Sequence, residues 1–234
     1  MIARYPTADV LNPILWLGCH ESGKLTPAGS GVAVNINGGQ YLVTALHVIN
    51  DCKLNPWVRY NGQWNAINWQ TLAVDEDNDI AVLKTETILD SQKIPVLYGE
   101  PDGLIYGQIG YALGFPGFAD GRNLSTDHII EAGGRPIPIV SLAVANFTST
   151  GNATYSASYI NAGFSGGAIV FPVGNDKWTI AGIITHFPTV KRAVYRDGRE
   201  TGDYIKQHTG LVGYTPFKVV EKLIMNAEPT KRLA

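Results

Sequence analysis

The chain has 234 residues, of which 45% are apolar and 16% are charged, and its formal net charge at pH 7 is −2. This apolar content can fill one large core or two smaller ones, so we expect a globular protein. The weak charge excludes the basic surface on which nucleic-acid binding depends, and it leaves no polybasic segment for a membrane surface. The longest uninterrupted apolar stretches, such as residues 14–17 and 168–171, are far shorter than the roughly 18 residues that a membrane-spanning helix needs.

The N-terminus and the cysteines bear on the cellular compartment of the protein. Residues 1–6 lack the apolar segment and the small-residue cleavage site of a secretory signal, so a cytoplasmic location is the default expectation, although a longer precursor could carry a signal. Cys19 and Cys52 are the only cysteines, too few for the disulfide-dense framework of a small secreted domain. We interpret both as buried thiols, and their spacing alone does not decide whether they pair.

Short strand signals separated by turn residues recur along the first third of the chain. They cover residues 14–19, 31–36, 40–44, 57–60, 64–69 and 80–84. This rhythm is typical of an antiparallel barrel. A stretch richer in turn and charged residues follows at 85–103, and we place the join between two domains there, which predicts domains at 1–95 and 96–234.

A second set of strand signals follows the join. It covers residues 108–113, 128–132, 139–147, 153–158, 167–171, 179–185 and 211–214. The sequence therefore predicts an all-β protein of two six-stranded antiparallel β-barrels. From Pro216 the apolar period changes to Val219, Val220, Leu223 and Ile224, which predicts a C-terminal helix that packs on the second barrel.

His47 is the first candidate for chemistry. Peptide hydrolysis without a metal needs a hydroxyl nucleophile, a neutral imidazole to activate it, a carboxylate to orient the imidazole, and amide donors for the oxyanion. His47 ends the apolar run 41–46 and precedes a helical turn at 50–52, so its backbone is rigid. A histidine among apolar neighbours is more often structural, and its context must decide.

Asp79 is the candidate carboxylate. It lies directly before the apolar residues 80–83 and 32 residues after His47, where it can be partly buried. Asp75 and Asp77 belong to the same acidic cluster but fit a solvated loop better. We therefore expect Asp79 to orient His47.

Ser165 is the candidate nucleophile. Glycines at 163, 166 and 167 surround it, so backbone amides can approach a bound carbonyl without obstruction by side chains. The N–H groups of Gly163 and Ser165 are the expected oxyanion donors. The three segments together predict a catalytic triad of His47, Asp79 and Ser165.

The order of these motifs resembles that of the trypsin-like (chymotrypsin-fold) serine peptidases, and most closely the protease core of the HtrA-type (high-temperature-requirement) proteases. The segments that carry the resemblance are Gly29–Val32, Leu42–Val48, Asp79–Leu83, Ala112–Gly117 and Ile160–Ala168. The resemblance implies a double barrel with the active site in its cleft, and a serine endopeptidase that acts on peptides or proteins through an acyl-enzyme. It implies no cofactor, and the length leaves no room for the PDZ domain that many relatives carry.

The resemblance also implies the positions that border the substrate. These are Tyr159, Ile160, Ile184, Thr185, His186, Phe187 and Val212. Because none of them carries a fixed charge, a buried Lys, Arg, Asp or Glu would stay unpaired, and we expect cleavage after small or medium aliphatic residues. His186 could instead favour glutamate, as a pocket histidine does in related proteases. The Thr185 hydroxyl is expected to reach Asp79.

The chain departs from the family pattern beside the nucleophile. Phe164 stands where relatives usually have Asn or Asp, and Ala162 stands where they have Pro. An apolar side chain cannot compensate a buried ammonium, so we do not expect a newly cut N-terminus to insert there. We expect packing of Phe164 against the second barrel, or bound substrate, to order the loop, and the unprocessed chain to be competent.

Three other classes of protein fit the sequence less well. Residues 163–167 also fit the G-x-S-x-G elbow of α/β-hydrolase esterases, but that elbow leads into a helix, whereas residues 168–172 favour a strand. A double-barrel scaffold that binds a peptide or partner without turnover is the non-enzyme alternative. A metal enzyme is poorly supported, because the five histidines include no His-x-x-x-His pair.

Overall fold

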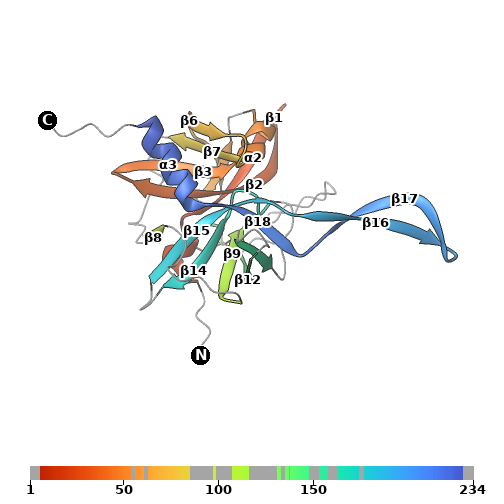
Figure 1. The fold of residues 1–234 in the computed structure, drawn as a ribbon. Coiled ribbons are helices and arrows are strands. Elements are labelled where there is room, and N and C mark those ends of the chain that lie inside the picture. Colours follow the sequence, from red (N-terminus) through yellow and green to blue (C-terminus); the bar gives the residue numbers. More distant parts are fainter. Residues whose placement is uncertain are drawn as a thin grey trace.

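Two β-sheets, one above the other in Figure 1, make up the body of the protein. The computed structural model describes residues 6–53, 56–60, 63–84, 97–98, 107–115, 131–132, 135–136, 138–147, 153–157, 163–173 and 177–228. Almost all of its regular structure is strand, which confirms the predicted all-β class. Among the described residues, no helix is long and apolar enough to span a bilayer.

The first sheet contains seven antiparallel strands in the order β5-β4-β1-β2-β3-β7-β6. They are β1 (Ile14–Glu21), β2 (Lys24–Ile36), β3 (Gly39–Ala45), β4 (Trp57–Tyr60), β5 (Gln63–Ala66), β6 (Gln70–Asp75) and β7 (Ile80–Lys84). Helix α1 (Ala8–Leu11) precedes them, and α2 (Leu46–Asp51) follows β3.

The strand expected at 64–69 is shorter than predicted, and the strand that follows it, β6, was not predicted, so the first sheet has seven strands rather than the expected six. β5 ends at Ala66 and β6 begins at Gln70, while the Trp69 indole N–H donates to the Pro56 carbonyl (2.9 Å) in the link between them. β6 lies at the edge of the sheet and leaves Val74 45% exposed. A half-exposed edge strand has no continuous apolar run, which is why its signal was missed.

The second sheet brings a ring of strands together. Its members are β8 (Leu97–Tyr98), β9 (Ile109–Gly114), β12 (Ile139–Phe147), β13 (Ala153–Ala157), β14 (Ala168–Val173), β15 (Lys177–His186) and β18 (Leu211–Pro216). Antiparallel pairings run β14-β9-β12-β13-β18-β15 and return from β15 to β14, so these six strands form a closed circle of neighbours, as predicted. β8 adds a short parallel pairing to β15.

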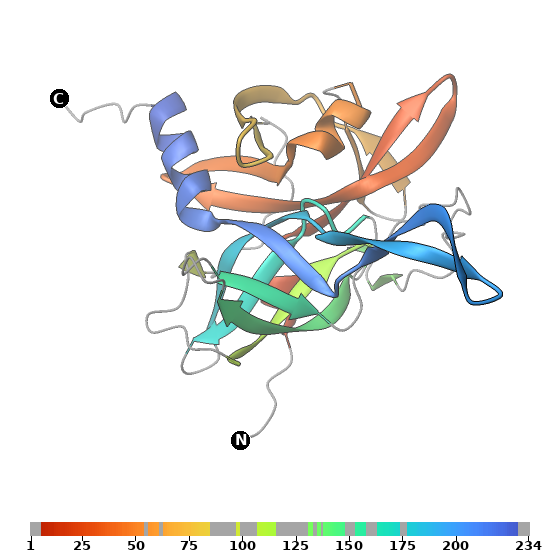
Figure 2. The same ribbon diagram turned by 45° about the vertical axis from the view of Figure 1, so that its right-hand side comes forward.

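Two further pairs of strands lie outside these sheets. β10 (Glu131–Ala132) pairs with β11 (Arg135–Pro136), within the region where a strand was expected at 128–132. β16 (Thr189–Arg196) pairs with β17 (Arg199–His208) in a long hairpin that projects from the body (Figures 1 and 2). The sequence did not predict this hairpin, because its mostly exposed side chains give no apolar alternation.

Buried apolar side chains form three clusters. One draws only on the first sheet and α2, one only on the second sheet, and the largest draws on both sheets and the C-terminal helix. Alternate residues of one strand enter different clusters: Leu42 of β3 faces the first sheet's own core, whereas Val43 enters the shared cluster. Ile169 and Val170 of β14 divide in the same way between the second sheet's core and the shared cluster.

This division explains the continuous apolar runs of the sequence. A strand buried on both faces needs apolar residues at consecutive positions rather than at alternate ones. Each such side chain stabilises the fold by about 1.5–3 kcal/mol when it is fully buried. The shared cluster therefore joins the two sheets firmly.

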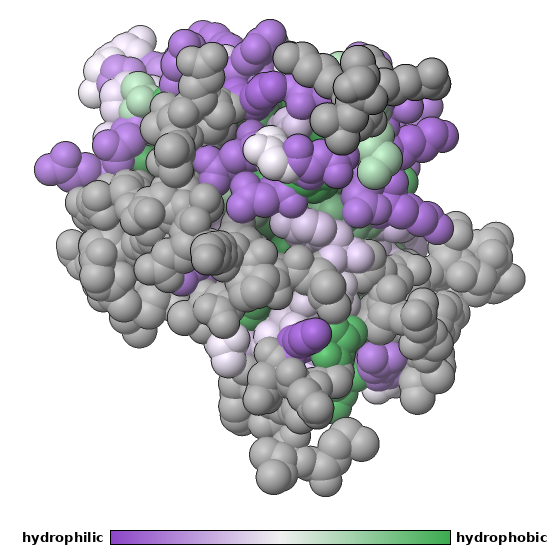
Figure 3. Space-filling view, turned by 90° about the vertical axis from the view of Figure 1, so that its left-hand side faces the viewer, coloured by the Kyte–Doolittle hydropathy of each residue, from purple (hydrophilic) through white to green (hydrophobic). Residues whose placement is uncertain are grey.

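Helix α3 (Phe217–Ala227) closes the shared cluster at one side. Its Phe217, Val220 and Ile224 are buried there, and the Phe217 ring stacks on Tyr98 at 4.4 Å between centroids. The predicted helix and its packing on the second sheet are confirmed, and the same side chains also pack against the first sheet, which the sequence did not predict. Figure 2 shows α3 beside the upper sheet. In Figure 3, hydrophilic side chains cover most of the upper half of the described face.

A polar cluster fixes the end of α3 to the first sheet. The Tyr41 hydroxyl donates to Glu228 Oε2 (2.6 Å), and Lys84 forms an ion pair with the same carboxylate. Hydrogen bonds from Lys84 and Tyr41 lower the pKa of Glu228, while burial and the Glu228 carboxylate raise the pKa of Tyr41 to about 12. The carboxylate therefore stays ionised between its two partners.

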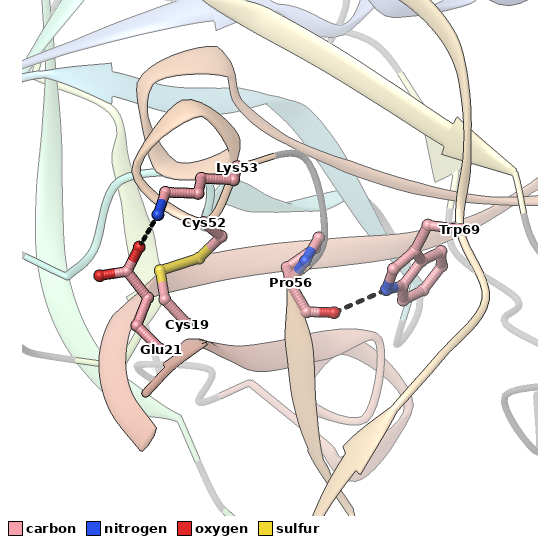
Figure 4. Close-up of a disulfide and its surroundings, with 6 residues drawn as sticks. All are labelled: Cys19, Glu21, Cys52, Lys53, Pro56 and Trp69. Carbon is pink, nitrogen blue, oxygen red and sulfur yellow. Dashed lines mark hydrogen bonds and ion pairs between the residues drawn. A yellow bond between two sulfur atoms is a disulfide. The ribbon is translucent and has the colours of Figure 1, made fainter. Parts of the chain in front are cut away.

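A disulfide ties β1 to the end of α2 (Figure 4). Cys19 and Cys52 are bonded across 33 residues of sequence, so their interpretation as buried thiols is wrong. The two cysteines come together because the sheet folds α2 back onto β1, which spacing alone does not reveal. An ion pair between Lys53 Nζ and Glu21 Oε1 (2.5 Å) lies beside the bridge. The short helix that carries His47 is thus held at its far end.

The double variant Cys19→Ser/Cys52→Ser should lower the free energy of unfolding by about 2–4 kcal/mol, because a cross-link of this span restricts the unfolded chain. Urea denaturation with and without a reductant measures it. The reductant should destabilise the wild type and leave the variant unchanged. A wild type that is insensitive to reductant would show that the bridge does not contribute.

Candidate active site

The pairing of β3 with β7 brings His47 and Asp79 together. Ala45, the last residue of β3, lies opposite Ile80, the first residue of β7. The next residues continue the contact, because the Leu46 N–H donates to the Asp79 carbonyl (3.0 Å). His47 and Asp79 therefore meet at the same end of the sheet.

The Asp79 carboxylate holds His47 at two points. Its Oδ2 lies 2.7 Å from His47 Nδ1, and its Oδ1 accepts the His47 backbone N–H at 3.0 Å. A carboxylate in this position fixes the imidazole with Nδ1 protonated and leaves Nε2 free to accept a proton. Both side chains keep contact with solvent, at 47% and 33% exposure.

The loop before Asp79 is held from both sides. Asp75 accepts hydrogen bonds from the backbone and side-chain amides of Asn78 (3.0 and 2.8 Å), so this carboxylate caps the turn. The Thr215 hydroxyl on β18 donates to the Asn78 carbonyl (2.7 Å) across the two sheets. Asp79 itself has a φ of 53°, a left-handed conformation that aspartate adopts more readily than most residues.

Ser165 lies in a tight turn before β14 and is 6% exposed. The Gly166 N–H donates to the Ile184 carbonyl (2.7 Å), and the Gly167 N–H donates to the Phe164 carbonyl (2.8 Å). The Ser165 carbonyl accepts the N–H of Ser30, on β2 of the first sheet, at 2.8 Å. The turn is thus tied to both sheets.

Two glycines of this turn lie against backbone with no space for a side chain. A Cβ on Gly166 would lie 2.0 Å from the Ser30 carbonyl oxygen, and one on Gly167 would lie 2.1 Å from the Leu113 carbonyl oxygen. Gly166 also has a φ of 84°, which L side chains rarely adopt. The glycines therefore allow the close approach as well as the turn.

Phe164 packs where the sequence predicted. Its side chain is fully buried in the cluster of the second sheet, which confirms the expected packing against the second barrel. Gly114 makes room for it, because a Cβ there would lie 2.9 Å from the Phe164 ring. The residue before the nucleophile is thus anchored by apolar contacts rather than by an ion pair.

The predicted substrate positions lie on β15 and β18. Ile184 and Val212 are buried in the second sheet's cluster, Phe187 packs against it, and Tyr159 and Ile160 lie outside the described residues. His186 is exposed, and its ring lies against the Gly213 backbone, where a Cβ would come within 2.0 Å of it. Their contact with substrate stays a prediction.

The expected contact of Thr185 is wrong. Its hydroxyl lies 3.2 Å from His186 Nδ1, and the Asp79 carboxylate instead contacts the backbone and ring of His47. The hydroxyl that contacts this loop belongs to Thr215, which sequence reasoning missed. Within the described part of the chain, no hydrogen bond joins Ser165 and His47. Such contacts often tighten only when substrate binds.

A histidine–aspartate pair at the end of one antiparallel sheet, and a serine in a glycine-rich turn of the next, match the arrangement of double-barrel serine peptidases. The strand that follows Ser165 excludes the strand-to-helix elbow of the α/β-hydrolases. A family model described as "Trypsin-like peptidase domain" matches residues 29–183. The chain belongs to this family.

Individual relatives agree with this assignment. The chain is 31% identical over 167 residues to "Protease Do-like 5, chloroplastic" of Arabidopsis thaliana, covering 66% of this chain and 48% of the relative. It is 32% identical over 149 residues to "Serine protease Do-like HtrA" of Lactococcus lactis, covering 63% and 35%. The chain thus spans less than half the length of these relatives.

A solved structure supports the fold. The MamO protease domain from Magnetospirillum magneticum, in its apo form, superposes with a TM-score of 0.51 and 18% identity, covering 92% of this chain and 96% of that one. Identity at this level supports the shared architecture and not a shared activity.

Gly166→Ala should destabilise the protein by several kcal/mol, because the added Cβ meets backbone and the positive φ costs about 1–2 kcal/mol more. Gly38→Ala is the matched control, since Gly38 has a φ of 77° and nothing lies within 4 Å of its Cβ position. Thermal unfolding of both variants measures the difference. Equal losses in the two variants would contradict the close contact of the Ser165 turn with β2.

Proposed function

We propose that this chain is a serine endopeptidase that cleaves peptide bonds through an acyl-enzyme, with His47, Asp79 and Ser165 as its catalytic triad. The observation that carries the proposal is the two-point contact of the Asp79 carboxylate with His47, at 2.7 and 3.0 Å. Membership of the trypsin-like peptidase family supports peptides or proteins as substrates.

The first half of the proposed reaction forms the acyl-enzyme. Ser165 Oγ attacks the peptide carbonyl while His47 Nε2 takes its proton, and Asp79 stabilises the resulting imidazolium. The negative charge that develops on the carbonyl oxygen is met by the N–H groups of Gly163 and Ser165. His47 then returns the proton to the leaving amine, and the peptide bond breaks.

The second half regenerates the enzyme. A water molecule gives its proton to His47 and attacks the acyl carbonyl, with the same two amides holding the oxyanion. Collapse of this intermediate returns the proton to Ser165 Oγ and releases the acid product. No metal or cofactor takes part in the proposed cycle.

For specificity, we propose small or medium aliphatic residues before the cleaved bond. Ile184, Phe187 and Val212 belong to one apolar cluster beside the Ser165 turn, and Phe164 is part of it. Phe187 is the partly exposed member of this group. An aliphatic side chain gains about 1.5–3 kcal/mol on burial against an apolar surface, whereas an unpaired charge loses its hydration. His186 is the titratable side chain among the described positions of the proposed pocket, so glutamate is the chief competitor.

The Cys19–Cys52 disulfide bears on the cellular compartment in which the protein works. Disulfides persist in oxidising compartments and are rare in the cytoplasm. We therefore propose an oxidising compartment in place of the cytoplasmic default. Protein from its source cells should carry no thiol that alkylates before reduction, and two alkylated cysteines would contradict this.

A fluorophosphonate probe should label the wild type, and Ser165→Ala should abolish the labelling, since the nucleophile is gone. His47→Ala should slow peptide hydrolysis by several orders of magnitude, and the double variant should be no slower than either single variant. His20→Ala is the control, because that ring stacks on Trp57 away from the triad.

Labelling that persists in Ser165→Ala would assign the nucleophile elsewhere. A wild type that neither labels nor cleaves would favour the binding scaffold, an alternative consistent with the missing hydrogen bond between Ser165 and His47.

Cleavage of a diverse peptide library should show Val, Ala, Leu or Ile before the cut. Mass spectrometry of the products gives the preference directly, with Ser165→Ala as the blank. A profile dominated by Glu would transfer specificity to His186, and one dominated by Lys or Arg would overturn the apolar assignment.

A further inference from the structure

Ser30 is the residue of the first sheet in closest contact with the Ser165 turn. It lies on β2, is fully buried, and is 133 residues from its hydrogen-bond partner in the turn. A buried serine hydroxyl must find partners, and most find them on their own sheet. This one finds both of its partners on the second sheet's side of the molecule.

The Ser30 hydroxyl is held in one orientation by two hydrogen bonds. Its Oγ donates to the Gly163 carbonyl at 2.7 Å and accepts the Phe115 N–H at 2.8 Å. A hydroxyl has a single proton, so accepting from Phe115 leaves that proton directed at Gly163. The hydroxyl therefore acts as a fixed donor rather than as a free rotor.

The backbone of Ser30 is fixed as well. Its N–H donates to the Ser165 carbonyl at 2.8 Å, and its own carbonyl accepts the Thr44 hydroxyl at 2.6 Å. One residue of β2 thus holds the carbonyl groups of both Gly163 and Ser165. These are the two residues whose N–H groups are the proposed oxyanion donors.

We propose that Ser30 is a positioning residue that sets the oxyanion hole through its hydroxyl. The inference rests on the proposed function, because it concerns the same site. Gly163 has a φ of 98° and no Cβ, so its peptide groups rotate easily unless something holds them. The Ser30 hydroxyl holds the Gly163 carbonyl oxygen, and the carbon that carries this oxygen is two bonds from the donor nitrogen.

This role affects the transition state more than substrate binding. Oxyanion donors act on charge that develops only during the reaction, and their value depends on orientation before the reaction starts. Loss of one donor costs about 100- to 1,000-fold in kcat. Because Ser30→Ala keeps both donors and frees only one of them to rotate, we expect a smaller loss, about 10- to 100-fold in kcat with KM unchanged.

The experiment compares Ser30→Ala with Ser30→Thr, which keeps a hydroxyl, and with Thr179→Val. Thr179 is a matched control, because it is 3% exposed and lies on β15 five residues before Ile184. Steady-state hydrolysis of one cleaved peptide gives kcat and KM, and thermal unfolding shows that each variant is folded. Amide NMR spectra of the wild type and Ser30→Ala provide a readout that does not depend on activity.

We expect Ser30→Ala to lose kcat at constant KM, Ser30→Thr to recover most of it, and Thr179→Val to keep the wild-type rate despite a similar loss of stability. The NMR differences should centre on residues 163–165. If Ser30→Ala is as active as Thr179→Val, or if its amide signals at 163–165 do not change, the proposal is overturned. The wild type could be inactive while its amide signals at 163–165 still depend on Ser30. That result would contradict the proposed function and would support the hydrogen bonding of Ser30 to this turn.

Discussion

The apolar layer between the two sheets is the constraint on which the rest of the structure depends. Its strands bury both faces, one in their own sheet and one against the other sheet. Backbone polar groups at the edge of such a layer must find partners, because water does not reach them. The hydrogen bonds of Ser30 with the Ser165 turn and of Thr215 with Asn78 cross from one sheet to the other for this reason.

The candidate site follows from that packing. His47 lies in α2 two residues after the end of β3, Asp79 lies directly before β7, and Ser165 lies before β14. All three strands contribute to the shared layer. Strand ends are rigid, so few further contacts are needed to orient a side chain there. The side chains of Asp79, His47 and Ser165 therefore lie at the margin of a closely packed core, which restricts their movement.

Much of this was predictable from the residues, and the remainder has physical causes. Strand signals separated by turn residues predicted the all-β class, and the positions of His47 and Asp79 beside apolar runs predicted their contact. The β16–β17 hairpin lacks an apolar face, so pattern reasoning could not find it. The cross-sheet partners Ser30 and Thr215 are ordinary strand residues in sequence, and only the docking of the sheets gives them a role. The Gly29-Ser30-Gly31 motif was the one available signal.

We propose that the docking of the two sheets builds an oxyanion site at Gly163 and Ser165. A crystal structure of the protein after reaction with a fluorophosphonate tests it most directly. We expect phosphorus bonded to Ser165 Oγ, with the phosphoryl oxygen accepting hydrogen bonds from the N–H groups of Gly163 and Ser165. Phosphorus on another residue, or a phosphoryl oxygen that contacts neither amide, would contradict the account.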